Sequence, residues 1–562
     1  MNNRVVLLFR LACVALCAAC FAPPARAATL NVPAQYATIQ AAVTAASAGD
    51  TVLVADGTYT GAGNFNINFS GKDLTVQSAS GNPANCVIDC QRQGGGFILQ
   101  SNQTRNSSIA GFTIKNGSNS GVSISSAQPT VVNCILSGNF SSAGGGMNGG
   151  IAKNCVFTGN SGGYSGGGIY NGSAVDCVFI GNTGRYGGAI SSGGAVRCVF
   201  TGNAGFQGGG IFQGSATNCV FTGNSASGDS GSGIFMGGQG GGLYSGSATG
   251  CIFTGNTADF GGGLEGGNAR NCVFTGNSAR YAGGGIYGVA LYFCSVSGNS
   301  APTYGGVYSN SSVTNCIVWG NTSSGGGPNF SVSGTVTSSD IEGGSTGTGN
   351  ISVDPKFVNQ VTGNLHLIVG SPCINAGTLA VPTGFPFPST DVDGGKRIIG
   401  IAPDMGAYEY GNVGIFGAIS FDGIAPNAPA QIVTFQFRPV GGGAATVKTY
   451  LTTSDGAFYL YGAPDGKYTL WVKSPTCLAA IVPVTVTGGA VSGITATLEP
   501  GDANNDNACD ATDFGIFVSA YNSSASVPGS GYDPSCDFNG DGNVDPTDFG
   551  LLVGSYNTQG AP

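Results

Sequence analysis

One seven-residue phrase recurs along the middle of the chain and constrains the fold more than any other feature. "NCVFTGN" occurs at 154–160, 218–224 and 271–277, and "RCVFTGN" occurs at 197–203. The cysteine returns every 21 or 22 residues, with one step of 32, and an asparagine always follows it five residues later. A period this short corresponds to one coil of a solenoid, in which each coil packs only on its neighbours.

The phrase predicts a strand. Alternate side chains of "CVFT" lie on opposite faces, so Cys and Phe share one face while Val and Thr share the other. Burying the Cys and Phe face keeps a row of aromatic rings away from water. The asparagines are expected to bond the asparagines of neighbouring coils as a ladder, and glycines allow the corners. We therefore expect a mainly β chain built on a right-handed parallel β-helix solenoid.

The cysteines of this ladder are predicted to be free, buried thiols. Stacked strands lie about 4.8 Å apart, which separates the β-carbons by more than a disulfide prefers. Two alternatives stay open, namely disulfides, which an exported protein can form, and a metal-binding array, although no histidine accompanies the cysteines. The nine positions are Cys134, Cys155, Cys177, Cys198, Cys219, Cys251, Cys272, Cys294 and Cys316.

The repeat resembles that of a known family. "FTGN" combined with "GGAI" or "GGGI" is similar to the repeats of chlamydial polymorphic outer membrane proteins, surface proteins linked to adhesion, over about residues 134–322. The stretch 32–61 resembles the N-terminal cap of pectin-lyase-like β-helices, with a short amphipathic helix before a strand. Residues 371–410 resemble the tail segment that closes many bacterial β-helix surface proteins, and a cap is expected because an open solenoid end exposes strand edges.

The N-terminal segment and the net charge of the chain indicate its compartment. Residues 1–27 hold basic residues, an apolar run and "ARA" before Ala28, which is typical of a cleaved secretory signal. The net charge is −9, and removing the leader's three arginines makes it more negative, which argues against nucleic acid as a partner. No later apolar run predicts a transmembrane segment. We expect a secreted protein, extracellular or at the cell surface.

Composition changes after the solenoid, and four segments are predicted. Residues 1–27 are the signal peptide, and residues 28–411 are the β-helix with its N-terminal cap and closing segment. In residues 412–499 glycine becomes rarer, and "DGAFYLYGAPDGKYTLWV" is similar to carboxypeptidase-regulatory-like β-sandwich modules. Residues 500–562 are a small α-helical pair of calcium loops.

The C-terminal segment carries a duplicated set of oxygen ligands. "DANNDNACDATDFGIFVSAYN" begins at Asp502 and recurs as "DFNGDGNVDPTDFGLLVGSYN" from Asp537. Oxygen atoms at loop positions 1, 3, 5, 7, 9 and 12 suit Ca²⁺, and two ions are expected. The first set is Asp502, Asn504, Asp506, Ala508 through its carbonyl, Asp510 and Asp513; the second is Asp537, Asn539, Asp541, Asn543 through its carbonyl, Asp545 and Asp548.

The pair of loops resembles a type I dockerin. No helix precedes either loop, and position 12 is Asp rather than Glu, as in that family. The resemblance implies a cohesin-like protein partner contacted by loop positions 10 and 11. Those positions here are Ala511 and Thr512 in the first loop, and Pro546 and Thr547 in the second.

The sequence does not indicate a catalytic site. Asp259 and Glu265 are the nearest candidates among few, scattered charges, and the single histidine, His366, is expected to pack. A ligand face is predicted instead where the outward residues of the phrase form a flat strip, Thr158, Thr201, Thr222, Thr254, Thr275 and Trp319.

Three functions stay open. The favoured one is a non-enzymatic surface or scaffold-docked β-helix protein that contacts polysaccharide or a protein. The second is a polysaccharide lyase or glycoside hydrolase recruited through the dockerin, since dockerins often accompany such enzymes. The third is an adhesin.

Overall fold

The structure is a computed structural model of the chain. It describes residues 27–562 except 100–102, 126–128, 229–236, 381–385, 412–413, 425–431, 444, 452–455, 462–465, 487–490, 525–531 and 534. The predicted signal peptide, apart from Ala27, and the centre of the insertion between Cys219 and Cys251 therefore lie outside the described residues.

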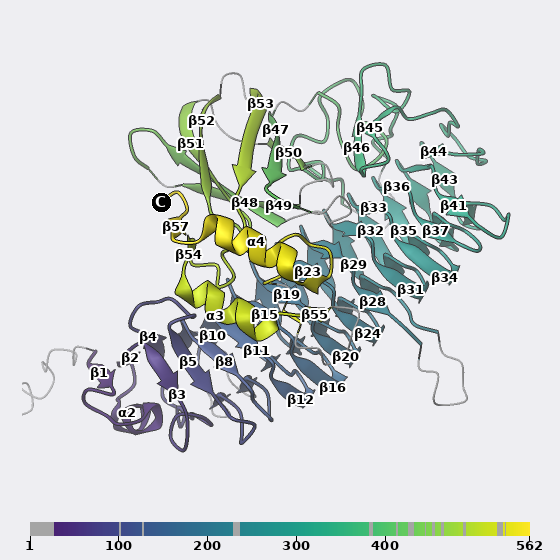
Figure 1. Ribbon diagram of the computed structural model, residues 1–562. Helices are drawn as coiled ribbons and strands as arrows, with labels where there is room; N and C mark the ends of the chain where they lie inside the picture. The colour runs from purple at the N-terminus through teal and green to yellow at the C-terminus, as the bar shows by residue number, and fades with distance from the viewer. Residues whose placement is uncertain are drawn as a thin grey trace, which may run out of the picture.

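Three parallel sheets form the walls of a long solenoid, as the repeat predicts (Figure 1). The sheet that carries the cysteine phrase has 13 strands: β3 (Gly57–Tyr59), β5 (Cys86–Asp89), β8 (Thr113–Lys115), β11 (Ile135–Ser137), β15 (Val156–Thr158), β19 (Val178–Ile180), β23 (Val199–Thr201), β27 (Val220–Thr222), β30 (Ile252–Thr254), β33 (Val273–Thr275), β36 (Ser295–Ser297), β40 (Ile317–Trp319) and β44 (Asp340–Ile341).

The largest sheet has 22 strands: β1 (Thr29–Val32), β2 (Thr51–Val54), β4 (Thr75–Ser78), β6 (Phe97–Leu99), β7 (Ser108–Ala110), β9 (Val122–Ile124), β10 (Thr130–Val132), β13 (Met147–Asn148), β14 (Ile151–Lys153), β17 (Ile169–Tyr170), β18 (Ser173–Val175), β21 (Ile190–Ser191), β22 (Gly194–Val196), β25 (Ile211–Phe212), β26 (Ser215–Thr217), β29 (Leu243–Thr249), β32 (Leu264–Arg270), β35 (Ile286–Tyr292), β38 (Val307–Ser309), β39 (Val313–Thr314), β42 (Phe330–Val332) and β43 (Val336–Thr337).

The third sheet has nine strands: β12 (Phe140–Ala143), β16 (Ser161–Ser165), β20 (Thr183–Tyr186), β24 (Ala204–Gln207), β28 (Ser225–Ala226), β31 (Thr257–Phe260), β34 (Ser278–Ala282), β37 (Ser300–Ala301) and β41 (Thr322–Ser323). The helix α2 (Ile39–Ala45) precedes β2 and buries Ile39, Ala42 and Val43, as its amphipathic pattern predicts.

The core follows the predicted parity. Phenylalanines of successive coils pair in register and stack, with ring centroids 4.6–4.9 Å apart from Phe157 to Phe274. The nine ladder cysteines are buried and free. Most accept a hydrogen bond at sulfur from the backbone N–H of the preceding cysteine, as Cys219 does from Cys198 at 3.4 Å. The disulfide alternative is thus not what the structure contains.

The asparagines form a continuous ladder inside the solenoid. Each side-chain oxygen accepts from the backbone N–H and the amide Nδ2 of the preceding asparagine, over distances of 2.9–3.0 Å at Asn203 and Asn224. Each Nδ2 also donates to a backbone carbonyl of the preceding coil, such as Phe200 for Asn224. Because Asn224 is 0% exposed, the ladder satisfies polar groups that water cannot reach.

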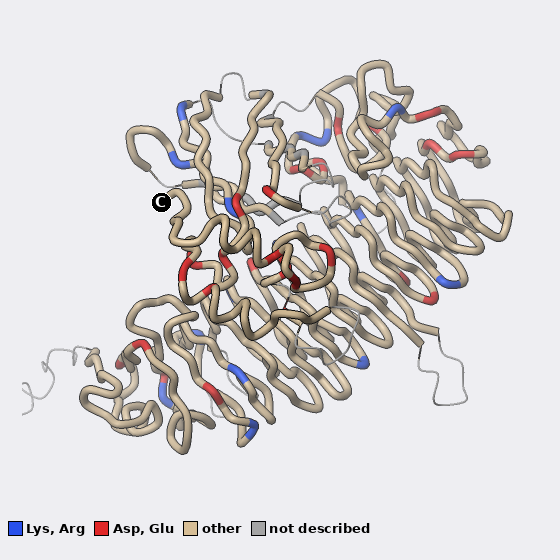
Figure 2. The backbone as a smooth tube through the Cα atoms, in the orientation of Figure 1, with Lys and Arg blue, Asp and Glu red and all other residues tan. Residues whose placement is uncertain are grey.

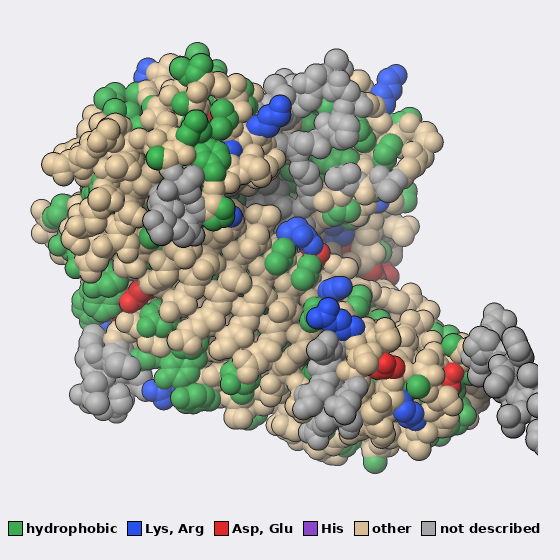
Figure 3. Space-filling model, turned by 180° about the vertical axis from the view of Figure 1, so that it is seen from behind, with side chains coloured by type: hydrophobic (Ala, Val, Ile, Leu, Met, Phe, Trp, Pro, Cys, Tyr) green, Lys and Arg blue, Asp and Glu red, His purple; other side chains and the backbone are tan. Residues whose placement is uncertain are grey.

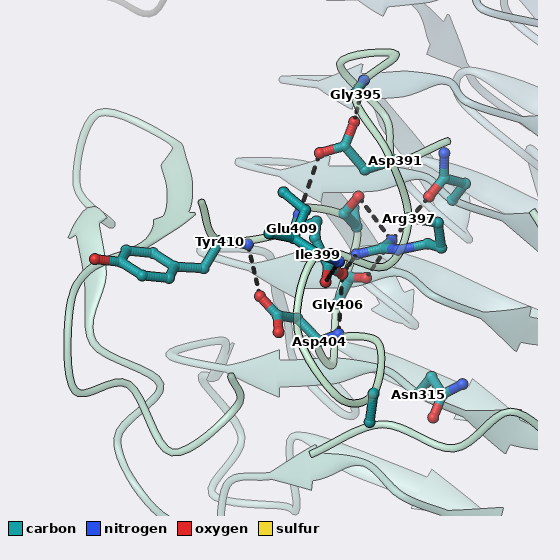
Figure 4. Close-up of polar contacts among 12 residues, drawn as sticks. Asn315, Asp391, Gly395, Arg397, Ile399, Asp404, Gly406, Glu409 and Tyr410 are labelled. Carbon is teal, nitrogen blue, oxygen red and sulfur yellow. Dashed lines mark hydrogen bonds and ion pairs between the residues drawn. The ribbon is translucent and has the colours of Figure 1, made fainter. Parts of the chain in front are cut away.

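The segment after the solenoid packs along its side, where the sequence predicts a closing cap. β45 (Phe357–Asn359) and β46 (Asn364–Leu367) pair as a hairpin, and Leu365 and Tyr408 join Val273 in one apolar cluster. The buried Arg397 donates to Asn271 and lies beside Glu409, with Nη2 to Oε2 at 3.1 Å (Figure 4). The segment therefore reaches several coils back along the outer face of the cysteine sheet.

Two small modules follow. The first is a sandwich of a three-stranded sheet, β50 (Ala457–Tyr461), β47 (Gly414–Phe421) and β53 (Val491–Leu498), and a four-stranded sheet, β49 (Thr446–Leu451), β48 (Ile432–Pro439), β51 (Gly466–Lys473) and β52 (Ala480–Val486). The second holds the helices α3 (Ala511–Ala520) and α4 (Pro546–Ser555) with two short strand pairs, β54 (Ala508–Cys509) with β57 (Thr558–Gln559), and β55 (Ser523–Ser524) with β56 (Asn543–Val544).

Each part has its own core. One apolar cluster lies between residues 30 and 341, a second between 415 and 498, and a third between 478 and 552. Leu478 of the sandwich belongs to the third cluster, so the two small modules share an apolar contact. In the part of the chain that the structure describes, no helix combines the length and apolar character needed to cross a membrane.

Candidate calcium loops and docking face

Both C-terminal loops begin their helices in the same way. Asp510 caps α3 and Asp545 caps α4, each accepting from a threonine N–H at 2.7 Å. Asp513 and Asp548 complete the two capping boxes. Position 6 has a positive φ in both loops, +70° at Asn507 and +90° at Gly542. Asn and Gly are the residues that adopt such a backbone at least cost.

In the first loop, Asp502 lies at the centre of the turn. Its Oδ1 accepts from the N–H of Asp506 at 2.9 Å, and its Oδ2 accepts from the N–H of Asn507 at 2.8 Å. Lys473 of β51 also reaches Oδ2, with Nζ at 2.7 Å, and this ion pair is buried. Asn504 accepts from Asp506, and Ala508 lies in β54. A lysine from the sandwich thus stands beside the first position of the loop.

The second loop repeats this geometry without the lysine. Asp537 accepts from the N–H groups of Asp541 and Gly542 at 3.1 and 2.9 Å, and from the hydroxyl of Tyr532 at 2.7 Å. Asn539 accepts from Asp541, and Asn543 lies in β56. Tyr532 therefore occupies the place beside position 1 that Lys473 takes in the first loop.

The acids gather in this module more than on the coils (Figure 2). Asp502, Asp513 and Asp548 are each 0% exposed. Burial raises the pKa of all three carboxyls, and neighbouring acids such as Asp510 and Asp545 raise the pKa of Asp513 and Asp548 further. Buried carboxylates that repel one another are stabilised by a cation.

The fit to a divalent ion rests on the chemistry of these donors. Among the described residues, no three acidic, cysteine or histidine side chains already form a metal-holding group. The hydrogen bonds above show why: the carboxylates turn onto the loop backbone, and Lys473 neutralises one of them. Each loop still supplies carboxylate, amide and backbone oxygens in the pattern that Ca²⁺ prefers, so the residues present fit this ion.

The four residues expected to contact a partner protein are all on the surface of the C-terminal module. Ala511, Thr512, Pro546 and Thr547 are all exposed, in the first turn of α3 or α4. Sequence reasoning did not single out their apolar neighbours as part of a docking surface. These are exposed by 39–56% and occupy equivalent places in the two halves: Phe514 and Val518 in α3 with Tyr521 at its C-cap, and Phe549 and Val553 in α4 with Tyr556 at its C-cap.

These six side chains, which we call the docking face, could have been found from the duplication. The same apolar types recur at the same offset from each loop, and each helix also has a buried residue, Phe517 or Leu552, that serves the core. The rings of Phe514 and Phe549 lie 6.5 Å apart, so the two halves of the docking face are continuous. An exposed apolar surface of this kind indicates a protein contact.

The predicted threonine strip is not open along its length. None of its residues is fully exposed, and Thr222 is only 8% exposed. The hydroxyl oxygens of Thr201 and Thr222 are both buried without a hydrogen-bond partner. Thr275 lies against the closing segment near Gly363, and Trp319 packs on the cluster that holds Leu367 and Met405. Thr158 and Thr254 remain half-buried.

The isolated candidates for catalysis have different surroundings. Asp259 accepts from the N–H groups of Gly228 and Gly238 at 3.1 and 2.7 Å, so it holds the base of the insertion. His366 lies between Asn364 and Asp393, at 2.8 and 2.7 Å, in the side-packed segment. Glu265 lies on β32, and its Oε2 is buried without a partner. The structure does not bring the three into one site.

Comparisons with known proteins agree with these parts. Residues 500–554 match the dockerin type I domain, and residues 271–289 match the Chlamydia polymorphic membrane protein repeat. No curated protein matches the chain.

Three solved structures are similar to parts of the chain. The type II cohesin-X-dockerin complex from Acetivibrio cellulolyticus is 22% identical, covers 26% of this chain and 97% of that chain, and has a TM-score of 0.22. Pectate lyase Pel9A is 16% identical, covers 66% of this chain and 90% of that chain, and has a TM-score of 0.30. A mannuronic acid specific family 6 lyase from human gut microbiota is 10% identical, covers 58% and 92%, and has a TM-score of 0.30. The C-terminal module is thus a domain of the dockerin type I family, joined through a β-sandwich to a parallel β-solenoid with polymorphic-membrane-protein-type repeats.

Proposed function

We propose that this chain is an exported, non-enzymatic β-helix protein that is held at a surface or scaffold by its dockerin and presents its solenoid to polysaccharide. The docking face carries the proposal, because six large apolar side chains at equivalent places in α3 and α4 and at their C-caps stay in water unless a partner covers them. The dockerin type I match supports a cohesin-like protein as that partner.

Calcium orders this face. The loops start the two helices, and their buried carboxylates repel one another unless a cation lies between them. Each loop takes one Ca²⁺ through the residues given above. In the first loop the ion and Lys473 compete for Oδ2 of Asp502, so this loop is the weaker site.

The solenoid contributes surface and length rather than a reaction. The candidate acids Asp259 and Glu265 have different surroundings, and the Asp259 carboxylate already accepts hydrogen bonds from two backbone N–H groups. A lyase or a hydrolase would release sugar or unsaturated product from polysaccharide, whereas this proposal expects binding without turnover.

The test is capture of the full chain by immobilised cohesin modules, with and without a calcium chelator. Two substitutions, Val518→Asp and Val553→Asp, place charge in the docking face, and Val361→Asp is the matched control, because Val361 is 97% exposed on the closing segment. We expect capture with calcium, its loss with chelator, and a loss of at least about tenfold in affinity for each docking-face variant only. Equal capture of all three variants would overturn the docking face, and capture in chelator would overturn the role of calcium.

A further inference from the structure

Aromatic side chains form a second ladder on the outside of the largest sheet. The outward positions of β25, β29, β32, β35 and β38 pair in register, and they carry Phe212, Tyr244, Glu265, Tyr287 and Tyr308. The rings of Phe212 and Tyr244 stack at 5.6 Å, and those of Tyr287 and Tyr308 lie 4.8 Å apart. With Phe260 of β31, whose ring meets Tyr287 at 5.3 Å, these residues form what we call the aromatic strip.

Glu265 interrupts the aromatic strip where another ring would fit. It lies between Tyr244 and Tyr287 in the strand register, and it is 8% exposed with Oε2 buried and unpartnered. An unsatisfied buried carboxyl costs about 1–3 kcal/mol, and the solenoid's stability does not require an acid at this position. A side chain that weakens the fold and stays polar in an apolar strip is typical of a binding site.

Burial raises the pKa of Glu265 to about 8. The titratable groups that face it are the phenols of Tyr244 and Tyr287, whose own pKa values are raised by burial and by Glu265, so both remain neutral as Glu265 titrates. On the neighbouring strands β31 and β34, Asp259 and Arg280 lie 4.0 Å apart as a pair. At neutral pH the strip therefore offers a carboxylic acid O–H and no net charge from Glu265.

The period of the strip selects the shape of a ligand. Equivalent positions repeat once per coil, about every 4.8 Å. An extended peptide repeats its side chains on one face every two residues, which is about 6.6 Å, and it falls out of step with the coils. Neighbouring rings of the aromatic strip stack on one another, with 15° between the planes of Phe212 and Tyr244, so they turn their edges outward. A hexose unit in an extended glycan has nearly the length of one coil step, so its C–H groups can contact one ring edge per coil while its hydroxyls accept hydrogen bonds.

We propose that the aromatic strip binds a neutral polysaccharide lengthwise, with sugar units against the ring edges of Tyr244 and Tyr287 and the Glu265 carboxyl donating to a sugar oxygen between them. This inference rests on the proposed function and names the surface through which the solenoid meets polysaccharide. Charged residues make up only 8% of the chain, and the view from behind shows them as separate groups between broad uncharged areas, which fits an uncharged polymer (Figure 3).

The test is retardation of the full chain in native gels that contain a soluble neutral β-linked glucan, a neutral mannan or polygalacturonate. Tyr287→Ala and Tyr244→Ala are expected to weaken retention on a neutral polymer by about tenfold. Tyr410→Ala is the matched control, because its ring is 39% exposed and points away from the closing segment's polar cluster (Figure 4). Circular dichroism identifies any variant that does not fold.

Glu265→Gln separates a binding role from packing. The amide can still donate, so retention persists at neutral pH, while the loss of retention that the natural protein shows as the pH rises through about 8 disappears. Retention on polygalacturonate alone, no retention on any polymer, or dimers that Tyr287→Ala dissolves would each overturn the inference. Capture by cohesin is measured on the same samples. Capture by cohesin without retention on any polysaccharide refutes only the aromatic strip as a binding site. Retention on a polysaccharide in the presence of chelator, without capture by cohesin, refutes only the proposed docking.

Discussion

Removing one rung of the asparagine ladder tests the packing of the solenoid most sharply. In Asn224→Ala four hydrogen bonds disappear: two into Oδ1, from the backbone and side chain of Asn203, and two from Nδ2, to Phe200 and Asn256. The backbone N–H of Asn203 loses its acceptor at a site with 0% exposure.

The expected cost follows from these partners. The stranded N–H of Asn203 contributes about 1–3 kcal/mol, and each of the other three bonds contributes about 0.5–1.5 kcal/mol. The sum is about 2.5–7.5 kcal/mol, which is large beside the net stability of most domains. Because a solenoid is stabilised coil by coil, the damage should centre on the coils that hold Asn203 and Asn256.

Urea denaturation gives the free energy, and hydrogen exchange read by mass spectrometry gives its location. Ser215→Ala is the control on the same coil, since Ser215 is exposed, and it should change stability by less than about 0.5 kcal/mol. A loss below about 1 kcal/mol in Asn224→Ala, or exchange that rises equally along the whole solenoid, would refute the reasoning.

Three further results are expected. Thiol titration should find the ladder cysteines unreactive in the folded protein and free after unfolding without reductant; four disulfides mapped between Cys134 and Cys316 would contradict this. Arg397→Met should lower the unfolding free energy by about 3–5 kcal/mol, because it leaves Glu409 buried and unpaired, and limited proteolysis should then release the closing segment; intact protease resistance would argue against the side packing. The pKa of Glu265 is raised from 4.5 to about 8, so its penalty is absent below the lower value and complete above the higher one. Glu265 should therefore lower stability with rising pH across that window, by at most about 1.4 kcal/mol per unit, and Glu265→Gln should remove this contribution to the slope.

The solenoid was predictable because its information is local and repeated. Alternation within "CVFT" gives the face of each side chain, and repetition gives the register, so Phe221 stacks on Phe200 and Phe253 as expected. The duplicated loops were predictable for the same reason, since their spacing places the caps and the positive φ of Gly542.

The remaining features depend on contacts between distant segments. Arg397 reaches Asn271 across 126 residues, and Lys473 of the sandwich reaches Asp502 of the first loop. No local sequence pattern predicts either contact, because a single charged side chain is compatible with many partners. Glu265 is different: it occupies the same repeat position as Tyr244 and Tyr287 on the adjacent coils, but the pattern alone does not show that its carboxyl is buried.

Calcium binding to the whole chain tests the central claim most directly. Isothermal titration of the chelator-treated protein should find two ions, one for each loop. Asp541→Ala should leave one ion and Asp506→Ala with Asp541→Ala none, while Asp176→Ala, an exposed acid on the solenoid that pairs with Arg197, should leave both. No calcium uptake by the natural protein, or uptake that the double variant retains, would contradict the account of the C-terminal module as a calcium-ordered docking domain.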